Sequence, residues 1–140
     1  TREVEEDSHT RVATGVSRMV DRFHIYVPDP KTLSRAKQTM ANDPNFCTSM
    51  PLETAQAVMD FHPEEVVNRI APRPILFISV KDDPLTANEL TQELYENAGE
   101  PKKWVMIPMS DEHHGIYLSP YREQVLQETT DWFRKYMPSQ

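Results

Sequence analysis

Two acidic side chains and two histidines in this sequence could together carry out acid–base chemistry. Asp82 and Asp83 come directly after one apolar run, and His113 and His114 follow the next apolar run along the chain. A carboxylate that accepts a hydrogen bond from Nδ1 of an imidazole fixes the tautomer of that ring, which leaves Nε2 free to act as a general base. The residue types therefore predict an acid–base pair of the kind that activates a nucleophile.

The two apolar runs have the pattern of strands in a parallel sheet. Residues 75–80 are apolar almost throughout, which is typical of a strand buried on both faces, and residues 104–107 form a second run. A helical pattern follows each run, and this order predicts an α/β fold with a right-handed crossover. Because loops that follow parallel strands emerge at one edge of the sheet, the acidic and histidine side chains can meet there.

The two helical patterns carry their own start and stop signals. Thr86 and Glu89 have the spacing of a capping box, and Gly99 lies where a glycine commonly follows a helix. Ser119, followed by a proline, predicts the start of the last helix. That helix has a stripe of residues predicted to be buried, namely Val125, Thr129, Trp132, Phe133 and Tyr136.

Residues 1–70 differ in character from residues 71–140. Three short helices, each starting at or next to a proline, are predicted within residues 29–70, and the first of them begins at Asp29. Residues 20–27 carry side chains typical of strands. We expect residues 1–70 to form a lid, or cap, with its connecting segment, and residues 71–140 to carry the acid and the histidine.

The composition narrows the classes of function that we expect. A net charge of −7 and an isoelectric point of about 5.2 argue against a nucleic-acid partner, because phosphate binding needs a basic surface. No apolar run approaches the ~20 residues that a membrane helix needs, so we expect no membrane partner. The single cysteine excludes an internal disulfide. The first residues lack the pattern of a signal peptide, and we expect a cytoplasmic location.

Two strands are too few for a stable sheet that is covered on both faces. Natural sheets commonly have about four to six strands, and exposed strand edges promote aggregation. Either strands within residues 1–28 complete the sheet, or another polypeptide supplies them. We favour the second interpretation, and we expect this chain to be a piece of a larger domain, because its first residues read like the middle of a polypeptide.

Four segments in the second half of the chain resemble parts of one known fold. Residues 70–78 look like the segment that leads into the strand before the catalytic acid of an α/β-hydrolase, and residues 93–103 resemble its next helix and the turn into its last strand. The other two segments are similar to the family's acid followed by proline and to its histidine loop; they are Asp83-Pro84-Leu85, and His113-His114-Gly115-Ile116-Tyr117 with Pro120-Tyr121. The resemblance is closest to the esterase, dienelactone-hydrolase-like and X-Pro dipeptidyl-peptidase-like branches.

The resemblance implies a serine hydrolase that acts on a small-molecule ester, amide or related acyl bond, without a cofactor or a metal. It assigns Asp83 as the catalytic acid, and leaves Asp82 as a solvated loop carboxylate. It assigns His113 as the general base, with His114 as the alternative. The family's nucleophile elbow, G-x-S-x-G, does not occur in this sequence. The family's order of nucleophile, acid and histidine therefore implies that the serine lies in an N-terminal part of the same hydrolase, present as a separate chain.

Other functions remain open at this point. One is a non-catalytic α/β module for binding or assembly, and another is a small metal-dependent enzyme that uses residues 111–114 with Asp82 and Asp83. Adjacent residues on one loop cannot easily point at one ion, so we expect no metal site. Cys47 stands in the right order for a cysteine hydrolase with Asp83 and His113, but no glycine or preceding strand prepares it as a nucleophile.

The helical segment 29–70 has a possible role in binding. By the resemblance, this segment occupies the place of a lid. Five of its apolar side chains could line an acyl or leaving-group pocket, or could simply pack the lid onto the main domain; they are Met40, Phe46, Met50, Met59 and Phe61. His9, His24 and His62 have no partner pattern, and we expect them to be structural or solvated.

Overall fold

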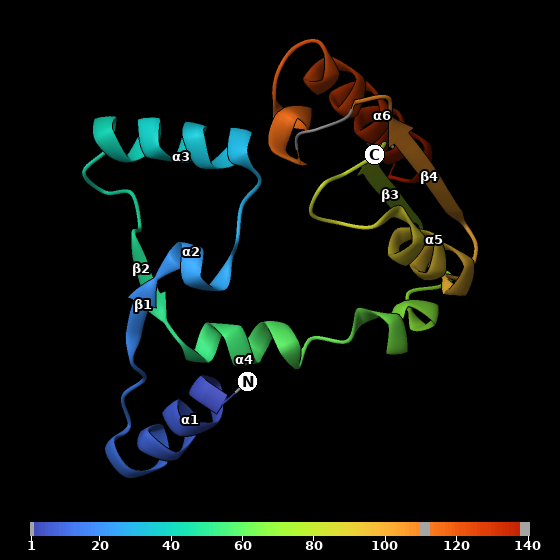
Figure 1. Cartoon of the computed structure of the whole chain (residues 1–140). Helices are drawn as coiled ribbons and strands as arrows, with labels where there is room; N and C mark the ends of the chain where they lie inside the picture. The colour runs from blue at the N-terminus through green and yellow to red at the C-terminus, as the bar shows by residue number, and fades with distance from the viewer. Residues whose placement is uncertain (1, 110–112, 138–140) are drawn as a thin grey trace. The chain divides into compact units, whose positions relative to one another are not determined.

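The computed structural model describes residues 2–109 and 113–137. The chain forms two compact units, Thr1–His62 and Pro63–Gln140 (Figure 1). The sequence pattern predicts a boundary between the two parts of the chain after residue 70. The units divide earlier, because the short 3-10 helices η1 (Pro63–Glu65) and η2 (Val67–Arg69) pack against α5 (Asn88–Asn97) of the second unit.

The first unit consists of helices joined by a small antiparallel ribbon. Its elements in chain order are α1 (Arg2–Thr14), β1 (Met19–Asp21), α2 (Arg22–Ile25), α3 (Pro30–Asn42), β2 (Ser49–Pro51) and α4 (Glu53–Met59). The ribbon pairs β1 with β2. In the part of the chain that the structure describes, residues 1–28 therefore add no strand to the parallel sheet of the second unit.

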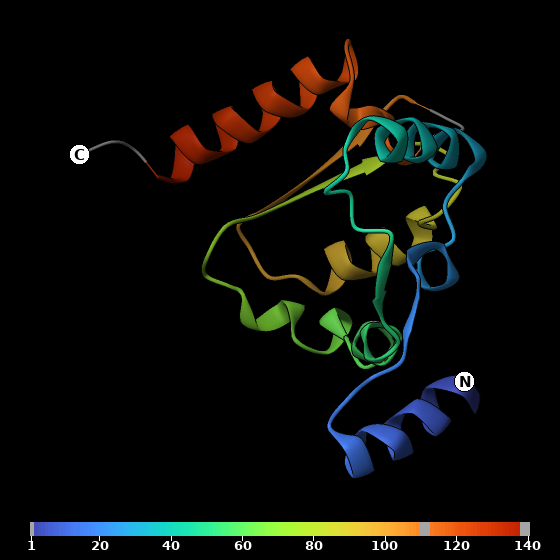
Figure 2. The same cartoon turned by 90° about the vertical axis from the view of Figure 1, so that its left-hand side faces the viewer.

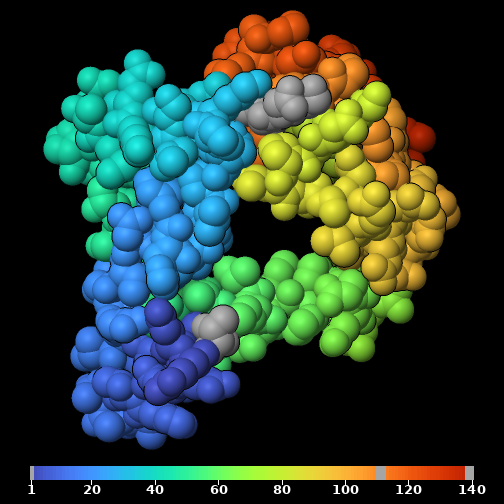
Figure 3. Space-filling model, viewed as in Figure 1, coloured from blue at the N-terminus to red at the C-terminus, as the bar shows by residue number. Residues whose placement is uncertain are grey.

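The helix predicted to begin at Asp29 is α3, and its capping follows the sequence signals. Asp29 is buried, and its Oδ1 accepts hydrogen bonds of 2.9 Å from the backbone N–H groups of Lys31 and Thr32. Pro30 occupies the first helical position, where a missing N–H costs nothing. None of the residues of α3 is buried, and the helix lies at the surface of its unit (Figure 3).

Two parts of the first unit differ from the sequence prediction. α1 has no predicted counterpart, because only Val4 and Asp7 of its residues are buried, which is too few to leave a periodic apolar pattern. The strand pattern of residues 20–27 extends only through Asp21. The carboxylate of Asp21 accepts a hydrogen bond of 2.7 Å from the N–H of Phe23 and starts α2 at that point.

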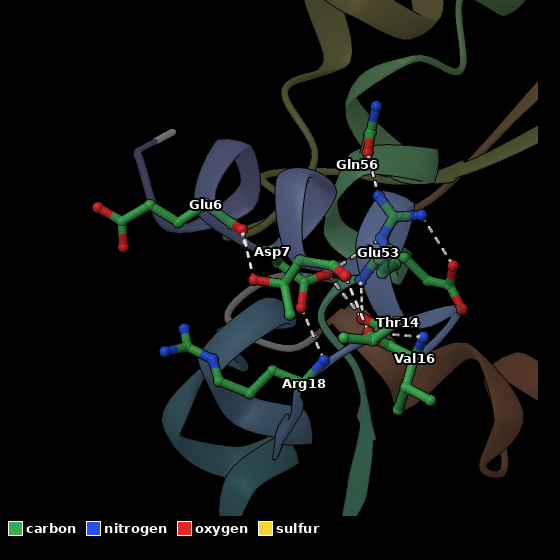
Figure 4. A network of polar contacts seen from close by, with 10 residues as sticks. Glu6, Asp7, Thr14, Val16, Arg18, Glu53 and Gln56 are labelled. Carbon is green, nitrogen blue, oxygen red and sulfur yellow. Dashed lines mark hydrogen bonds and ion pairs between the residues drawn. The ribbon is translucent and has the colours of Figure 1, made fainter.

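A buried carboxylate on α1 ties this helix to its neighbours. Asp7 accepts hydrogen bonds from Ser17 Oγ at 2.8 Å and from the Arg18 N–H at 2.6 Å (Figure 4). The Arg11 guanidinium lies 3.1 Å from the same carboxylate and 2.9 Å from that of Glu53 on α4. The hydrogen bond from the Arg18 N–H is the main cause that lowers the pKa of Asp7. The network therefore links α1, the loop that follows it and α4.

The second unit contains the parallel sheet and the helices that cover it. β3 (Ile75–Val80) pairs in parallel with β4 (Lys102–Ile107), and Val80 lies opposite Ile107. α5 and α6 (Tyr121–Tyr136) lie on opposite faces of the two strands (Figure 2). The predicted order of strand, helix, strand and helix is therefore confirmed.

The two faces of the sheet have different contacts. On the α5 face, the ring of Tyr95 lies 5.9 Å from that of Phe77 and 6.0 Å from that of Trp104. The core on the α6 face consists of Val80, Val105, Ile107 and Met109, and Tyr121 and Val125 of α6 pack against it. No residue of α6 is fully buried. Four members of the stripe predicted to be buried are half-buried, whereas Phe133 is 54% exposed, and for Phe133 the prediction is wrong; the four are Val125, Thr129, Trp132 and Tyr136.

The two ends of α5 differ in detail from the sequence prediction. The capping box of Thr86 and Glu89 does not form, because the helix starts one residue later, at a cap on Ala87 that no side chain completes. Gly99 follows the helix as predicted, but for a different reason. A Cβ atom at Gly99 would lie 2.6 Å from Cβ of Ala71, so this close approach requires glycine.

One edge of β3 lacks a paired strand among the residues described here. Alternate residues of a strand in a parallel ladder form hydrogen bonds to opposite sides. The N–H groups of Ile75 and Lys81 donate to the carbonyl oxygens of Pro101 and Ile107, so the odd-numbered residues of β3 face β4. The backbone groups that face the open edge are those of Leu76, Ile78 and Val80.

Candidate acid–base site

The loop after β3 holds the Asp83 side chain in place. Asp82 has φ 54°, a left-handed conformation that turns the chain directly after the strand. Oδ1 of Asp83 accepts hydrogen bonds from the N–H groups of Leu85 at 2.8 Å and of Thr86 at 3.1 Å. Such bonds from an Asp side chain to the backbone that follows it form an Asx-turn. The loop therefore orients its own carboxylate.

His113 is the first residue of η3 (His113–Tyr117), the short 3-10 helix that follows β4 in the chain. Gly115 of this helix is buried, and Ile116 packs against the core cluster that contains Ile107. Because η3 is anchored on the core at the end of β4, His113 lies beside the loop that follows β3. The sheet thus brings together two residues that are 30 positions apart in the sequence.

Asp83 and His113 form a hydrogen-bonded pair. Nδ1 of His113 lies 2.7 Å from Oδ2 of Asp83. A carboxylate only accepts, so the Nδ1–H of the ring donates this bond. The side chain of Asp83 is 5% exposed and that of His113 is 34% exposed. The acid is therefore shielded from solvent while the imidazole remains accessible, and Nε2 is the nitrogen that can take a proton from a nucleophile.

The surroundings of Asp83 favour its ionised form. Burial is the largest single influence and raises its pKa, but hydrogen bonds from the Leu85 N–H, from His113 and from the Thr86 N–H act in the opposite direction. Their sum lowers the pKa of Asp83 below its ordinary value. An ionised carboxylate at this place stabilises the positive charge that forms when His113 accepts a proton.

The alternative acid and base lie next to this pair. His114 is exposed, and its ring centroid lies 4.7 Å from that of His113 in an edge-to-face arrangement. Asp82 is exposed as well, and contributes the backbone turn described above. The structure therefore brings Asp83 and His113 into contact, and places Asp82 and His114 beside them.

The residues considered for cysteine and metal chemistry lie elsewhere. Cys47, in the first unit, is exposed, and its thiol donates a hydrogen bond of 2.9 Å to the carbonyl of Ser49, which is not a base that could activate it. Asp111 and Glu112 of the metal hypothesis lie outside the described residues. Within residues 2–109 and 113–137, no group of three or more His, Cys, Asp or Glu side chains could hold a metal ion.

A pocket of about 530 Å³ lies within the first unit. Its wall includes Leu52, Val58 and Met59, and the last of these is one of the five residues predicted to line a lid pocket. His24 also lines it; its side chain is 53% exposed, and its Nε2 lies 3.1 Å from a carboxylate oxygen of Glu3. The pocket is thus lined by apolar side chains together with the hydrogen-bonded pair of His24 and Glu3.

Asn88 lies at the other end of the loop that carries Asp83, and the sequence pattern does not mark it as a functional residue. It is the first residue of α5, and its Nδ2 donates a hydrogen bond of 3.0 Å to the carbonyl of Val80. The only signal in the sequence is an amide side chain at a predicted helix start. That signal is equally typical of an ordinary helix cap.

Three solved structures are similar to this chain. DcsB, in a complex with its substrate analogue, matches with a TM-score of 0.77 and 16% identity, over 98% of this chain and 50% of DcsB. The α/β hydrolase GrgF from Penicillium sp. sh18 matches with a TM-score of 0.70 and 13% identity, over 96% of this chain and 47% of GrgF. The hypothetical protein PA2218 from Pseudomonas aeruginosa matches with a TM-score of 0.66 and 15% identity, over 97% and 44%. No protein-family model and no curated protein matches the sequence.

These similarities show that the chain has an α/β-hydrolase-like fold, as the sequence predicts. The chain spans about half the length of each structure that it matches.

A helix that spans a membrane must be both long and apolar. In the described part of the chain, no helix is both long and apolar enough to cross a membrane.

Proposed function

We propose that this chain supplies the acid and the base of a serine hydrolase that cleaves an ester, an amide or a related acyl bond. The contact between His113 Nδ1 and Asp83 Oδ2 carries the proposal. Asp83 orients the imidazole, and Nε2 of His113 takes the proton of a serine hydroxyl and later gives it to the leaving group. The likeness to the α/β hydrolase GrgF supports this reaction class.

The nucleophile comes, in this proposal, from a part of the hydrolase outside this chain. Gly15, Gly99 and Gly115 are the only glycines in the sequence, and none has the spacing of a nucleophile elbow. The structural neighbours are about twice as long as this chain, which leaves room for such a part. We infer that a second polypeptide, the N-terminal part of the same hydrolase, carries the serine. The complex of the two is called the assembled hydrolase below, and residues 1–70 form its lid together with the connecting segment.

Labelling with a serine-reactive fluorophosphonate tests the assignment of the acid, because the probe reacts only with an activated serine. In the assembled hydrolase, Asp83→Asn should slow labelling by about 10⁴-fold, since the imidazole loses its orientation and its countercharge. Asp82→Asn is the matched control, because it makes the same chemical change one residue away, on an exposed side chain. Equal losses from the two substitutions would contradict the assignment.

The same assay distinguishes the two histidines. His113→Ala should abolish labelling, because it removes the ring that contacts Asp83. His114→Ala should leave a measurable fraction of the rate, and the opposite ranking would transfer the role of base to His114. An assembled wild-type protein that the probe does not label would contradict the hydrolase proposal and favour a non-catalytic binding module.

A further inference from the structure

One side-chain hydrogen bond joins the two ends of the loop that carries Asp83. Nδ2 of Asn88, at the start of α5, donates to the carbonyl oxygen of Val80, at the end of β3, over 3.0 Å. Val80 is 2% exposed, and its carbonyl faces the edge of β3 opposite β4. A buried carbonyl needs a partner, and within the described structure the Asn88 amide provides it.

Apart from the bond between Asp83 and His113 itself, few hydrogen bonds hold this loop to the sheet. The carboxylate of Asp83 accepts hydrogen bonds from two N–H groups of its own loop, which move with it. The turn at Asp82 is likewise internal to the loop. In the described part of the chain, the hydrogen bonds that connect the loop to the sheet are the one from the Lys81 N–H to the carbonyl of Ile107 and the one from Asn88.

The site requires an amide rather than a carboxylate. With Nδ2 of Asn88 on the Val80 carbonyl, Oδ1 is buried and has no hydrogen-bond partner among the described residues. A carboxylate of the same shape would place an oxygen against the carbonyl oxygen and would bury a negative charge. An acidic residue in the first turn of a helix ordinarily stabilises the helix through its dipole. Asn88→Asp would therefore break the contact with Val80 while stabilising α5, and an experiment can distinguish these two opposite effects.

We propose that Asn88 is a positioning residue, which holds the loop after β3 so that Asp83 meets His113. Asn88 contacts neither member of the pair directly, and acts through the backbone of Val80 and the start of α5. This inference rests on the proposed function, because it gives Asn88 a role in the reaction that Asp83 and His113 perform. It differs from a helix-capping role, since the amide bonds to a strand carbonyl and not to the N–H groups of its own helix.

Asn88→Asp and Asn88→Ala in the assembled hydrolase test this inference. The Nδ1 proton of His113 should give a low-field resonance in the wild-type proton NMR spectrum, and both variants should lose it as Asp83 moves away. The maximal rate of fluorophosphonate labelling should fall about 10- to 100-fold, while the probe concentration at half-maximal rate stays nearly unchanged. Asn97→Asp is the control, because it makes the same change at the exposed, opposite end of α5.

The outcomes separate this inference from the proposed function. A folded Asn88→Ala protein that keeps the low-field resonance and the wild-type labelling rate would overturn the inference. If Asn88→Asp does not fold, as circular dichroism would show, Asn88→Ala decides alone, because it removes the hydrogen bond without adding a charge. A wild-type labelling rate that does not depend on Asp83 would instead overturn the proposed function.

Discussion

At the scale of single residues, Asp83 links the chemistry of the site to the stability of the fold. Its side chain is 5% exposed, yet it stays ionised because two backbone N–H groups and an imidazole donate to it. A carboxylate with this many donors is stabilised in the folded chain relative to the unfolded one. The same bonds that orient His113 therefore make the fold sensitive to acid.

We predict that acidification destabilises the assembled hydrolase through Asp83. An unfolded Asp has a pKa of about 3.9, and the pKa of Asp83 is lowered in the folded chain. The ionised carboxylate thus contributes its full stabilisation above the unfolded pKa, and loses it as the pH falls through the lower folded pKa. Thermal unfolding across the acid range should show a weaker pH dependence of Tm for Asp83→Asn than for the wild type. Asp82→Asn, the control, should retain the wild-type dependence.

The sequence allowed the acid–base pair to be proposed, but not the residue that supports it. Asp83 and His113 follow apolar runs, and parallel strands place such positions at one edge. Asn88 bonds to a backbone carbonyl, and every residue has one, so no pattern of side chains marks its partner. The carbonyl of Val80 needs Asn88 only because it faces the edge of β3 opposite β4. That orientation becomes evident only when the pairing of β3 with β4 is known.

At the scale of elements, α5 is fixed by side chains at both of its ends. Asn88 binds its start to β3, and Lys102 of β4 binds its end. Nζ of Lys102 donates to the carbonyl oxygens of Tyr95 at 2.6 Å and of Ala98 at 2.8 Å, and lies 4.6 Å from the centre of the Tyr95 ring. A cation at a helix carboxyl end satisfies carbonyl groups that have no partner in the helix.

We predict that Lys102→Met destabilises the assembled hydrolase by about 1.5 to 3 kcal/mol, the range for hydrogen bonds to a charged group. Lys103→Met is the matched control. The Lys103 ammonium forms an exposed ion pair with Glu128, and such pairs contribute about 0 to 1 kcal/mol. Urea unfolding measures both changes. Equal losses of unfolding free energy would show that the end of α5 does not depend on Lys102.

The contact between Gly99 and Ala71 predicts a second effect at this scale. Gly99→Ala should destabilise the protein by about 1 to 3 kcal/mol, because two Cβ atoms 2.6 Å apart force the backbone to shift. Adding Ala71→Gly removes one of those atoms, so the double variant should recover part of the lost unfolding free energy. A double variant less stable than the sum of the two single changes predicts would contradict this explanation.

The sequence predicted the elements of the second unit more fully than those of the first. Strands β3 and β4 leave continuous apolar runs, and α3 has an acid and a proline at its start. α1 buries one apolar residue, and is attached through the buried carboxylate of Asp7 and its partners. Polar contacts between distant segments leave no periodic signal, so α1 could not be predicted from the pattern of its own residues.

At the scale of the whole molecule, the second unit leaves a strand edge unpaired and apolar side chains exposed. Among the described residues no second strand pairs with β3, and Leu76 and Ile78 direct backbone groups to its open edge. Leu126 and Phe133 of α6 are 56% and 54% exposed. The chain also spans about half the length of its structural neighbours. A partner that extends the sheet next to β3 would cover this surface and bring a nucleophile to His113.

We predict that the open edge of β3 becomes protected when the N-terminal part of the hydrolase binds. Alone, the 140-residue chain should bind a hydrophobic dye and show no esterase activity, because exposed apolar patches of this kind seldom persist in soluble monomers. Hydrogen exchange gives the sharper measurement. The amides of Leu76 and Ile78 should exchange quickly in the isolated chain and slowly in the assembled hydrolase. The amide of Phe77 faces β4, as do its odd-numbered neighbours, and serves as the internal control.

The hydrogen bond between Asn88 and Val80 limits how far along β3 an added strand can pair. The carbonyl of Val80 already accepts a hydrogen bond from Asn88, and the chain turns at Asp82, so we expect an added strand to pair with β3 mainly through Leu76 and Ile78. Protection should therefore end at Val80, immediately before the loop that carries Asp83. An isolated chain that melts cooperatively as a monomer, with Leu76 and Ile78 as protected as Phe77, would contradict both the open edge and the need for a second polypeptide.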